Sequence, residues 1–347
     1  MEGLRRRLEE VGRSAGLDLL GVAAVDPFPE VAGEMRRREA DGQARGLGFT
    51  YNDPDTATEP RLSYPWAQSM IVGGRSYLPG AGSPSPAAGL GRVARIAVED
   101  SYTPLRQALC SVAVSLHDAG HRAEVFCDDS RLVDRAAAWR AGLGWWGKNS
   151  MVLAPRFGPW LLFGSVVTDA RLEFDQPLAR DCGACSACLP ACPTGALVAP
   201  GVLDARLCLA AWAQAPGVIP EDMRIAMDDR LYGCDDCLDA CPPGHRLLNR
   251  SSASRGMIDL GEILTAADVV LLERFQHWFL PARDPDIIRR NALVAAGNSG
   301  RPDMTRLVAP YVAHPNPVLA EHARWALGRL GGTVADAVLQ SPLASGK

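Results

Sequence analysis

Cysteine spacing constrains this chain more than any other feature of its sequence. Eight of the ten cysteines lie between Asp181 and Pro242. The first four follow the pattern C-x2-C-x2-C-x3-C-P of bacterial-type iron–sulfur proteins, in which the fourth cysteine ligates the other cluster; they are Cys182, Cys185, Cys188 and Cys192. The last three repeat the C-x2-C-x3-C-P half, and Cys208 is available for its missing first position; they are Cys234, Cys237 and Cys241. The spacing therefore predicts two [4Fe–4S] clusters.

The repeated pattern also predicts how the ligands divide between the clusters. One set is expected to be Cys182, Cys185, Cys188 and Cys241, and the other Cys192, Cys208, Cys234 and Cys237. Disulfides or zinc sites are the alternatives, but disulfide frameworks belong to small secreted domains and zinc favours separated C-x2-C pairs. The two remaining cysteines, Cys110 and Cys127, are expected to be buried apolar thiols.

Length and composition indicate an ordinary soluble globular protein. The chain has 347 residues, 47% hydrophobic and 22% charged, which is enough for two or three domains. Its N-terminal helix lacks the apolar region of a signal peptide, and no apolar run reaches membrane-spanning length. Oxygen-sensitive clusters then make the cytoplasm the expected compartment.

Charge gives no global sign of nucleic-acid binding, because the net charge is −4 and the pI about 5.9. Among the 36 basic residues only Lys148 and Lys347 are lysine. Arginine suits phosphate recognition, but the same skew is typical of genome-wide composition bias.

The first predicted domain, residues 1–174, alternates strands and helices and is expected to have an α/β (α+β) fold. Strands are expected at 16–25, 69–78, 92–98, 122–127 and within 151–174, and helices at the N-terminus, at 103–118 and at 128–144 with Asp129 or Ser130 as its N-cap. The Gly- and Pro-rich segments 47–63 and 79–91 are expected to be loops. Asp128 follows a strand end, where α/β sheets place their ligands.

Two further domains are predicted: a ferredoxin-like two-cluster domain at 175–250 and a helical domain at 251–347, whose first part, 257–281, is expected to be helical. In the last domain, residues recur with an offset of 34, which is typical of HEAT-type helix pairs. The recurring residues are Arg290, Ala292, Leu293 and Gly297, repeated as Arg324, Ala326, Leu327 and Gly331.

Motifs for other cofactors are weak. The chain has neither G-x-G-x-x-G nor a P-loop, so a Rossmann nucleotide site lacks support. SLHDAG at 115–120 is similar to the D-x-H-x-x-G loop of some cobalamin enzymes, but serine replaces the aspartate. His117 is therefore expected to be an ordinary helix residue.

Several longer segments together resemble the epoxyqueuosine reductase family, from about residue 16 to residue 246. They are EPRLSYPWAQSMIV (59–72), Asp128 followed by RAAAWRAGLGWWGKNS, FGPWLLFGSVVTD (157–169), CGACSACLPACPTGALVAPGVLDARLC (182–208) and YGCDDCLDACP (232–242). Many ferredoxin-like proteins share the cluster motif, whereas its combination with RAGLGW-x-GKN is specific.

The resemblance implies a cobalamin- and [4Fe–4S]-dependent reductase that converts epoxyqueuosine to queuosine in the tRNA anticodon loop. Electrons would pass from an external low-potential donor protein through the clusters to cobalamin, and a carboxylic acid would protonate the leaving oxygen. Asp128 matches the family's acid; the alternatives are that Asp128 only caps a helix or that Asp134 is the acid.

The same resemblance implies candidate cobalamin contacts in and near the glycine-rich block. Trp145 or Trp146 is expected to cover the corrin, and Lys148 to bind a phosphate or corrin amide. The full set of cobalamin candidates is Arg140, Gly144, Trp145, Lys148 and Tyr102.

Departures from the family pattern occur where substrate or corrin would be contacted. The chain has ARIAVEDSYT for A-R-Y-A and D-Y-H, GLGFTYN for the G-E-M-x-x-M loop, CPPGH for CPWN, and LAAWAQA after Cys208. Two alternatives therefore remain: a related corrinoid reductase acting on a small molecule, as in reductive dehalogenases, or an electron-transfer protein. We expect a monomer without membrane association.

Overall fold

A computed structural model of the chain describes residues 2–45, 51, 53–78, 89–250 and 256–340. Contacts divide it into two compact units. Unit 1 comprises 1–78, 100–206 and 236–251, and unit 2 comprises 79–99, 207–235 and 252–347. The units are thus built from interleaved segments, whereas the sequence suggests three consecutive domains; the boundaries 174/175 and 250/251 stay predictions.

Unit 1 is organised around a four-stranded sheet in the order β1-β2-β7-β4. Its strands are β1 (Leu19–Ala23), β2 (Ser69–Ser76), β7 (Leu161–Thr168) and β4 (Ala123–Phe126). All three pairings are antiparallel, so the expected alternation of strands and helices does not produce a parallel sheet here. The sequence is ambiguous because β2 is buried on both faces and reads as a continuous apolar run, as parallel strands do.

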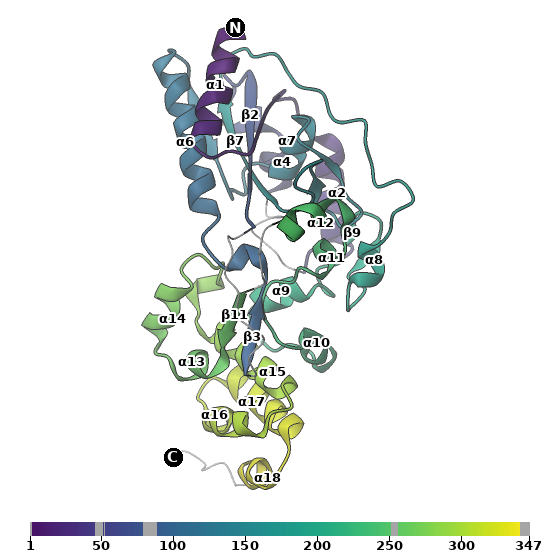
Figure 1. Cartoon of the computed structure of the whole chain (residues 1–347), viewed down its shortest axis with the longest axis vertical. Helices are drawn as coiled ribbons and strands as arrows, with labels where there is room; N and C mark the ends of the chain where they lie inside the picture. The colour runs from purple at the N-terminus through teal and green to yellow at the C-terminus, as the bar shows by residue number, and fades with distance from the viewer. Residues whose placement is uncertain (1, 46–50, 52, 79–88, 251–255, 341–347) are drawn as a thin grey trace. The chain divides into compact units, whose positions relative to one another are not determined.

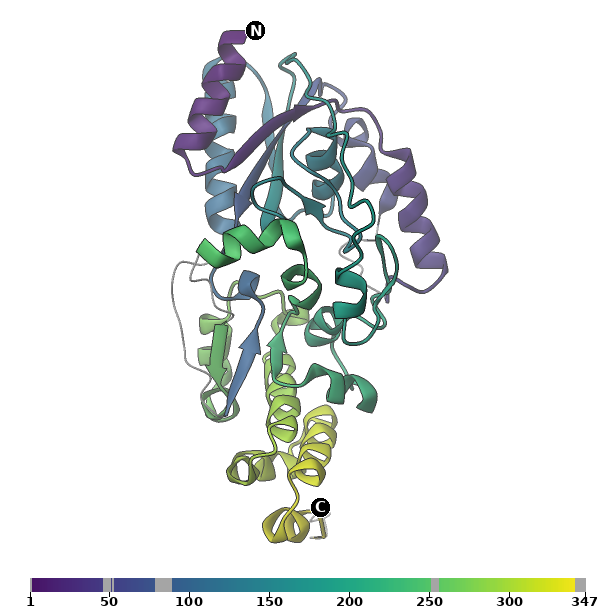
Figure 2. The same ribbon diagram turned by 45° about the vertical axis from the view of Figure 1, so that its right-hand side comes forward.

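Helices cover both faces of this sheet, as Figures 1 and 2 show. On one face, α1 (Glu2–Ser14) and α6 (Tyr102–Asp118) pack against Ile71 and Val166. On the other, α7 (Asp134–Arg140) packs against Met70 and Val167. Neighbouring residues of one strand therefore serve opposite cores, as the two-residue period of a strand requires.

Two helix starts differ from those expected. The helix expected from residue 103 begins at Tyr102, and the amides of Tyr102 and Thr103 donate to Asp100 Oδ1 at 3.0 Å, so Asp100 stabilises the first turn of α6. The helix expected from residue 128 begins only at Asp134, because Asp129 binds Arg131 instead of capping a helix.

Ten further elements complete unit 1 in the part of the chain that the structure describes. They are α2 (Pro29–Ala40), α4 (Pro54–Thr58), α5 (Pro60–Ser63), β5 (Trp145–Trp146), β6 (Val152–Leu153), α8 (Cys188–Ala191), β8 (Leu197–Ala199), β9 (Val202–Leu203), α11 (Asp236–Asp239) and α12 (Pro242–Arg250). Thus the segment 47–63, expected to be a loop, contains two short helices in its described part, while most of 79–91 lies outside the described residues.

Unit 2 contains a small mixed sheet in the order β10-β3-β11. These strands are β3 (Leu90–Val93), β10 (Arg230–Tyr232) and β11 (Gly256–Asp259). The strand expected at 92–98 was too long, because the chain turns into a 3-10 helix at Arg95–Ala97. There the backbone N–H and guanidinium of Arg95 donate to buried Asp235 at 2.8 and 3.1 Å.

Helices build the rest of unit 2. They are α9 (Leu209–Gln214), α10 (Glu221–Met227), α13 (Leu260–Thr265), α14 (Asp268–Arg274), α15 (Asp286–Asn298), α16 (Thr305–Val308), α17 (Pro317–Leu330) and α18 (Thr333–Gln340), with 3-10 turns at Pro281–Arg283, Pro302–Met304 and Ala309–Ala313. The region 257–281 therefore begins with a strand before its two helices.

The repeated residues in α15 and α17 lie on two helices that pack together in the same core. A Cβ on Gly297 would lie 2.8 Å from the Cα of Ala326, so glycine permits this close approach. Gly331 instead ends α17 with a φ of 63°. The two glycines that recur at an offset of 34 residues therefore have different structural roles. The HEAT assignment stays a prediction.

A buried polar network ties α15 and α17 to the segment 207–235 within unit 2. Asn291 donates to the backbone oxygens of Ala213 and Leu231 at 2.8 and 2.7 Å. His322 is fully buried; its Nε2 accepts from Ile219 N at 3.2 Å, while its Nδ1 faces Val318 O at 2.6 Å. These partners require the neutral ring with its proton on Nδ1.

None of the described helices combines the length and apolar character needed to cross a bilayer.

Acid should weaken unit 2 through His322. Burial lowers the pKa of His322 to about 4, with the charges of Arg224 and Arg290 adding to the shift and that of Glu321 opposing it. The unfolded chain then binds the proton more readily, so stability is complete above about pH 6.5 and falls towards pH 4, by up to about 3 kcal/mol. Denaturant unfolding under anaerobic conditions at pH 7 and pH 5 should show a smaller loss in His322→Gln than in the wild type. An equal loss in both proteins, with exposed His117→Gln as control, would contradict this role.

Candidate functional site

The four thiols of the first predicted ligand set gather in unit 1. Burial, together with the neighbouring thiols Cys182, Cys188 and Cys185, raises the pKa of Cys241 to about 12. Burial also raises the pKa of Cys188, again with Cys182 and Cys185 contributing. No three described His, Cys, Asp or Glu side chains lie close enough to share a single metal ion.

Local hydrogen bonds shape the loop that carries the first three of these cysteines. Asp181 Oδ1 accepts from Gly183 N at 2.6 Å, and Lys148 Nζ donates to Gly183 O at 2.7 Å. Cys188 begins α8, and Cys241 follows α11; these two helices pack together. The elements of 175–250 that belong to unit 1 therefore bring cysteines from both motifs into one group.

The second predicted set is spread over different local environments. Cys192 Sγ accepts from Ala196 N at 3.2 Å, which is the kind of amide–sulfur bond that cluster ligands receive. In unit 2, Cys208 lies at the N-terminal boundary of α9, and half-buried Cys234 packs against the core that contains Leu209 and Met223. The assignment of Cys192, Cys208, Cys234 and Cys237 to one cluster stays a prediction.

Cys110 and Cys127 differ from each other. Cys127 is fully buried, as expected, and burial raises its pKa to about 12. Cys110 is exposed on α6, so the expectation of a buried thiol was wrong there. Helical periodicity places Cys110 beside buried Leu109 but on the solvent side.

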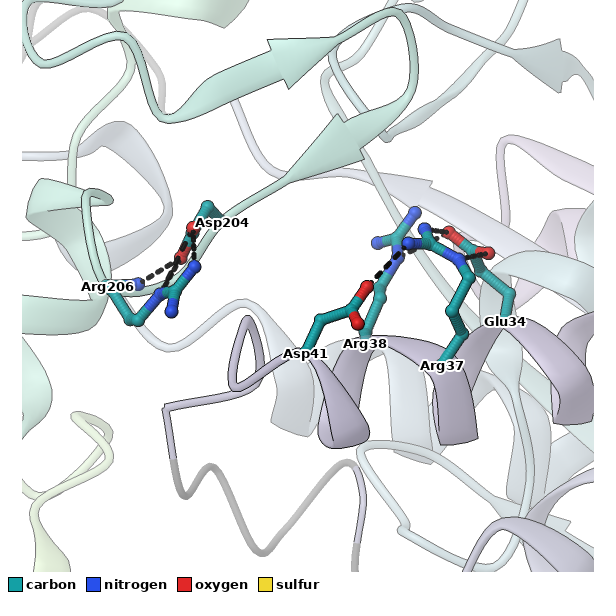
Figure 3. Close-up of polar contacts among 6 residues, drawn as sticks. All are labelled: Glu34, Arg37, Arg38, Asp41, Asp204 and Arg206. Atoms are coloured by element: carbon teal, nitrogen blue, oxygen red, sulfur yellow. Dashed lines mark hydrogen bonds and ion pairs between the residues drawn. The ribbon is translucent and has the colours of Figure 1, made fainter.

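A hydrogen bond from Arg38 joins the hairpin that follows Cys192 to α2, and Figure 3 shows the ion pairs within each of the two segments. Arg38 donates to Gly201 O at 3.0 Å and to Glu34 at 2.7 Å. Arg206 pairs with Asp204, its Nη2 lying 2.6 Å from Oδ2. Carboxylates thus neutralise arginines in this part of unit 1, and exposed pairs of this kind contribute little to stability.

Asp128 lies in the loop after β4 with a φ of 53°, a left-handed conformation that is uncommon for a residue other than glycine. The residue is exposed, yet protein packed around its carboxyl raises the pKa through desolvation, with the positive charge of Arg106 opposing this shift. Arg106 also donates to Cys127 O. Asp128 is therefore an accessible carboxyl that holds its proton more tightly than a normal aspartate.

Asp134 lies in a different environment. Its Oδ1 is closed off from solvent and has no hydrogen-bond partner among the described residues. Burial raises its pKa well above the usual range, with the charge of Asp128 adding to the shift. An acid that meets a substrate needs access to it, so the geometry favours Asp128 over Asp134 for that role.

Tyr102 shares this neighbourhood. Burial raises the pKa of Tyr102, and the nearby carboxyls of Asp128 and Asp134 contribute. Its backbone oxygen lies 3.9 Å from Cys127 Sγ. Of the predicted cobalamin contacts, Tyr102 is thus the one that the structure places beside Asp128.

The other four predicted cobalamin residues contact other parts of the protein. The Arg140 guanidinium lies 3.4 Å above the Phe28 ring and donates to Pro27 O at 2.8 Å. A Cβ on Gly144 would lie 2.4 Å from Leu153 O. Lys148 binds the Gly183 backbone, and Trp145 is buried against Cys241. Their contact with a corrin stays a prediction, to which these interactions add no support.

Arg106 is the residue near Asp128 that sequence reasoning missed. It lies four residues after Tyr102 on α6, one helical turn away. Because residues four apart on a helix are neighbours, the sequence could have identified Arg106 from its spacing to the candidate Tyr102.

Cys241 belongs to the second cysteine motif but is expected to bind the first cluster, so its loss should remove that cluster. In Cys241→Ser, the hydroxyl is a poor iron ligand and the first set is left with three thiols. Chemical iron analysis and optical absorption of anaerobically reconstituted protein should then show one cluster per chain instead of two. Exposed Cys110→Ser is the matched control and should retain both clusters. A wild-type iron content in Cys241→Ser would exclude Cys241 from the ligand set.

Comparisons with known proteins agree with a two-cluster iron–sulfur region. Residues 181–244 match a family model described as a 4Fe-4S double cluster binding domain. The epoxyqueuosine reductase of Staphylococcus aureus is 31% identical over 95% of this chain and 89% of its own. That of Vibrio cholerae is 38% identical over 58% of this chain and 57% of its own.

The fold is also similar to that of a solved relative. A crystal structure of epoxyqueuosine reductase with an epoxyqueuosine-modified tRNA-Tyr stem loop superposes with a TM-score of 0.90 at 28% identity, covering 98% of this chain and 93% of that one. Sequence and structure therefore agree across nearly the whole chain, and it belongs to the epoxyqueuosine reductase family.

Proposed function

We propose that the chain reduces epoxyqueuosine to queuosine in the anticodon loop of tRNA. The observation that carries this proposal is family membership over nearly the full length, including a relative solved with an epoxyqueuosine-modified stem loop. The same coverage favours this function over the small-molecule reductase and the electron-transfer protein considered from the sequence. A cytoplasmic location and a monomeric state stay predictions.

The reaction sets clear requirements. Both carbon–oxygen bonds of the epoxide break, an alkene forms between the two carbons, and the oxygen leaves as water. This consumes two electrons and two protons. The chain must therefore deliver electrons one at a time and supply a proton to the departing oxygen.

The cysteine sets meet the first requirement. Iron–sulfur clusters carry single electrons and perform no bond chemistry alone. An external low-potential protein is the proposed donor, because the sequence contains no nucleotide-binding glycine motif for a hydride carrier.

Asp128 meets the second requirement. Desolvation raises its pKa, so the carboxyl carries a proton closer to neutral pH than a normal aspartate would. Its exposed position gives a substrate access, and Arg106 keeps the pKa from rising further. Asp128 would donate this proton to the epoxide oxygen as the carbon–oxygen bond breaks.

Cobalamin is the proposed second cofactor, on the strength of the family resemblance. When bound, it would supply strongly reducing electrons at the carbon of the epoxide. Tyr102 fits a place beside it, since this residue adjoins the acid. The ring and hydroxyl of Tyr102 would help to exclude water around Asp128.

Loss of the acid should abolish turnover. In Asp128→Asn the amide matches the carboxyl in shape but cannot donate an acidic proton, so queuosine formation from epoxyqueuosine tRNA should fall by at least about a hundredfold. Mass spectrometry of nucleosides after incubation with a low-potential reductant measures this. Asp129→Asn, the neighbouring carboxylate that binds Arg131, should keep most activity. Absence of queuosine with wild-type, cluster-loaded protein would overturn the proposed function itself.

Arg106 should set the alkaline limit of activity. The acid works while protonated, so activity falls as pH rises through the pKa of Asp128. In Arg106→Gln the positive charge that lowers this pKa is lost, and the alkaline limb should move to higher pH. A pH profile of single-turnover rates tests the direction; an unmoved limb, or a shift to lower pH, would remove Arg106 from this role.

A further inference from the structure

The indole N–H of Trp145 is a buried donor without an acceptor. Trp145 is 2% exposed, and its Nε1 has no hydrogen-bond partner in the part of the chain that the structure describes. Indole nitrogen can only donate. Buried donors in native proteins are nearly always paired, so an orphan indicates a missing water, ion or ligand.

Sulfur atoms are the side-chain acceptors among the hydrophobic neighbours of this ring. Trp145 packs with Leu153 and Cys241, and Met151, Leu178 and Cys182 pack against the same group. The leucines offer no side-chain acceptor, and Met151 Sδ already faces Arg135 Nη1 at 3.8 Å. The sulfurs that remain belong to Cys182 and Cys241, both members of the first predicted ligand set.

The ring is held in place from two sides. Trp145 pairs with Leu153 in the β5–β6 ribbon, which Gly147 N closes by donating to Met151 O at 2.7 Å. The guanidinium of Arg180 lies 4.1 Å from the centre of the indole ring. A cation occupies the ring face, so the edge that carries Nε1 is left to meet another group.

We infer that the indole N–H of Trp145 donates a hydrogen bond to a sulfur of the cluster held by Cys182, Cys185, Cys188 and Cys241. This rests on the proposed ligand set. Thiolate and sulfide sulfurs accept such bonds, and they become stronger acceptors when the cluster gains an electron. The bond therefore stabilises the reduced cluster and raises its reduction potential, and the positive charge of Arg180 acts in the same direction.

The assignment gives Trp145 a different role from the corrin cover expected from the sequence. Its neighbour Trp146 is 41% exposed and lies on the other face of the ribbon, since successive residues of a strand point in opposite directions. The adjacent pair thus provides a test residue and a matched control with the same side chain.

The test is a redox titration of the cluster-loaded full chain followed by EPR. Trp145→Phe keeps an aromatic ring but removes the N–H, so the midpoint potential of one cluster should become more negative while that of the other stays. Trp146→Phe should leave both midpoints unchanged. If both clusters of Trp145→Phe have the same midpoint potentials as in the wild type, the inference is overturned.

A second replacement covers the event that phenylalanine disturbs packing and iron is lost. Site-specific incorporation of benzothienylalanine at position 145 retains the bicyclic shape with sulfur in place of N–H. The same negative shift supports the hydrogen bond, and an unchanged potential excludes it. Failure of the ligand set is recognised separately, because Cys241→Ser would then keep both clusters.

Discussion

Crowding of thiols around buried Cys241 is the constraint on which the cysteine region depends. Cys241 is removed from water beside Cys182, Cys185 and Cys188, and this environment opposes a thiolate so strongly that its pKa rises to about 12. Four thiolates here would repel one another, and the positive charge of iron is what offsets that repulsion. Metal binding is then coupled to folding, since it stabilises an arrangement of α8 and α11 that the thiolates alone oppose. The hydrogen bonds of Asp181 and Lys148 to Gly183 stabilise the loop on which this arrangement is built.

The same desolvation has a different result around Asp128 and Asp134. The charge of Asp128 raises the pKa of Asp134, but Asp128 is exposed, whereas Asp134 is closed off from solvent at Oδ1. A buried carboxyl that holds its proton adds no negative charge beside Asp128. Asp134 therefore adds no repulsion at the proposed acid, while the positive charge of Arg106 lowers the pKa of Asp128.

Local patterns were predictable from the sequence, whereas long-range contacts were not. Cys182, Cys185 and Cys188 are close in sequence, so their spacing alone predicts a cluster motif. The family model for a 4Fe-4S double cluster binding domain matches the same region. Pairing of β2 with β1 and β7 depends on distant residues, and a strand buried on both faces gives no sign of direction. The candidate contacts Arg140 and Lys148 were chosen by type, but backbone oxygens from remote segments take up their donors. Trp145 illustrates the same difficulty, because its closest cysteines lie far along the chain.

The interleaved order of the chain has a consequence for biosynthesis. Between Cys188 and Cys241 the polypeptide runs through Leu207–Asp235, which belongs to unit 2. A ribosome must therefore complete part of the second unit before the last proposed ligand of the first cluster emerges. With the proposed ligand set, cluster insertion would be a late event in maturation, and a chain interrupted within that segment would carry three closely spaced thiols without their fourth partner.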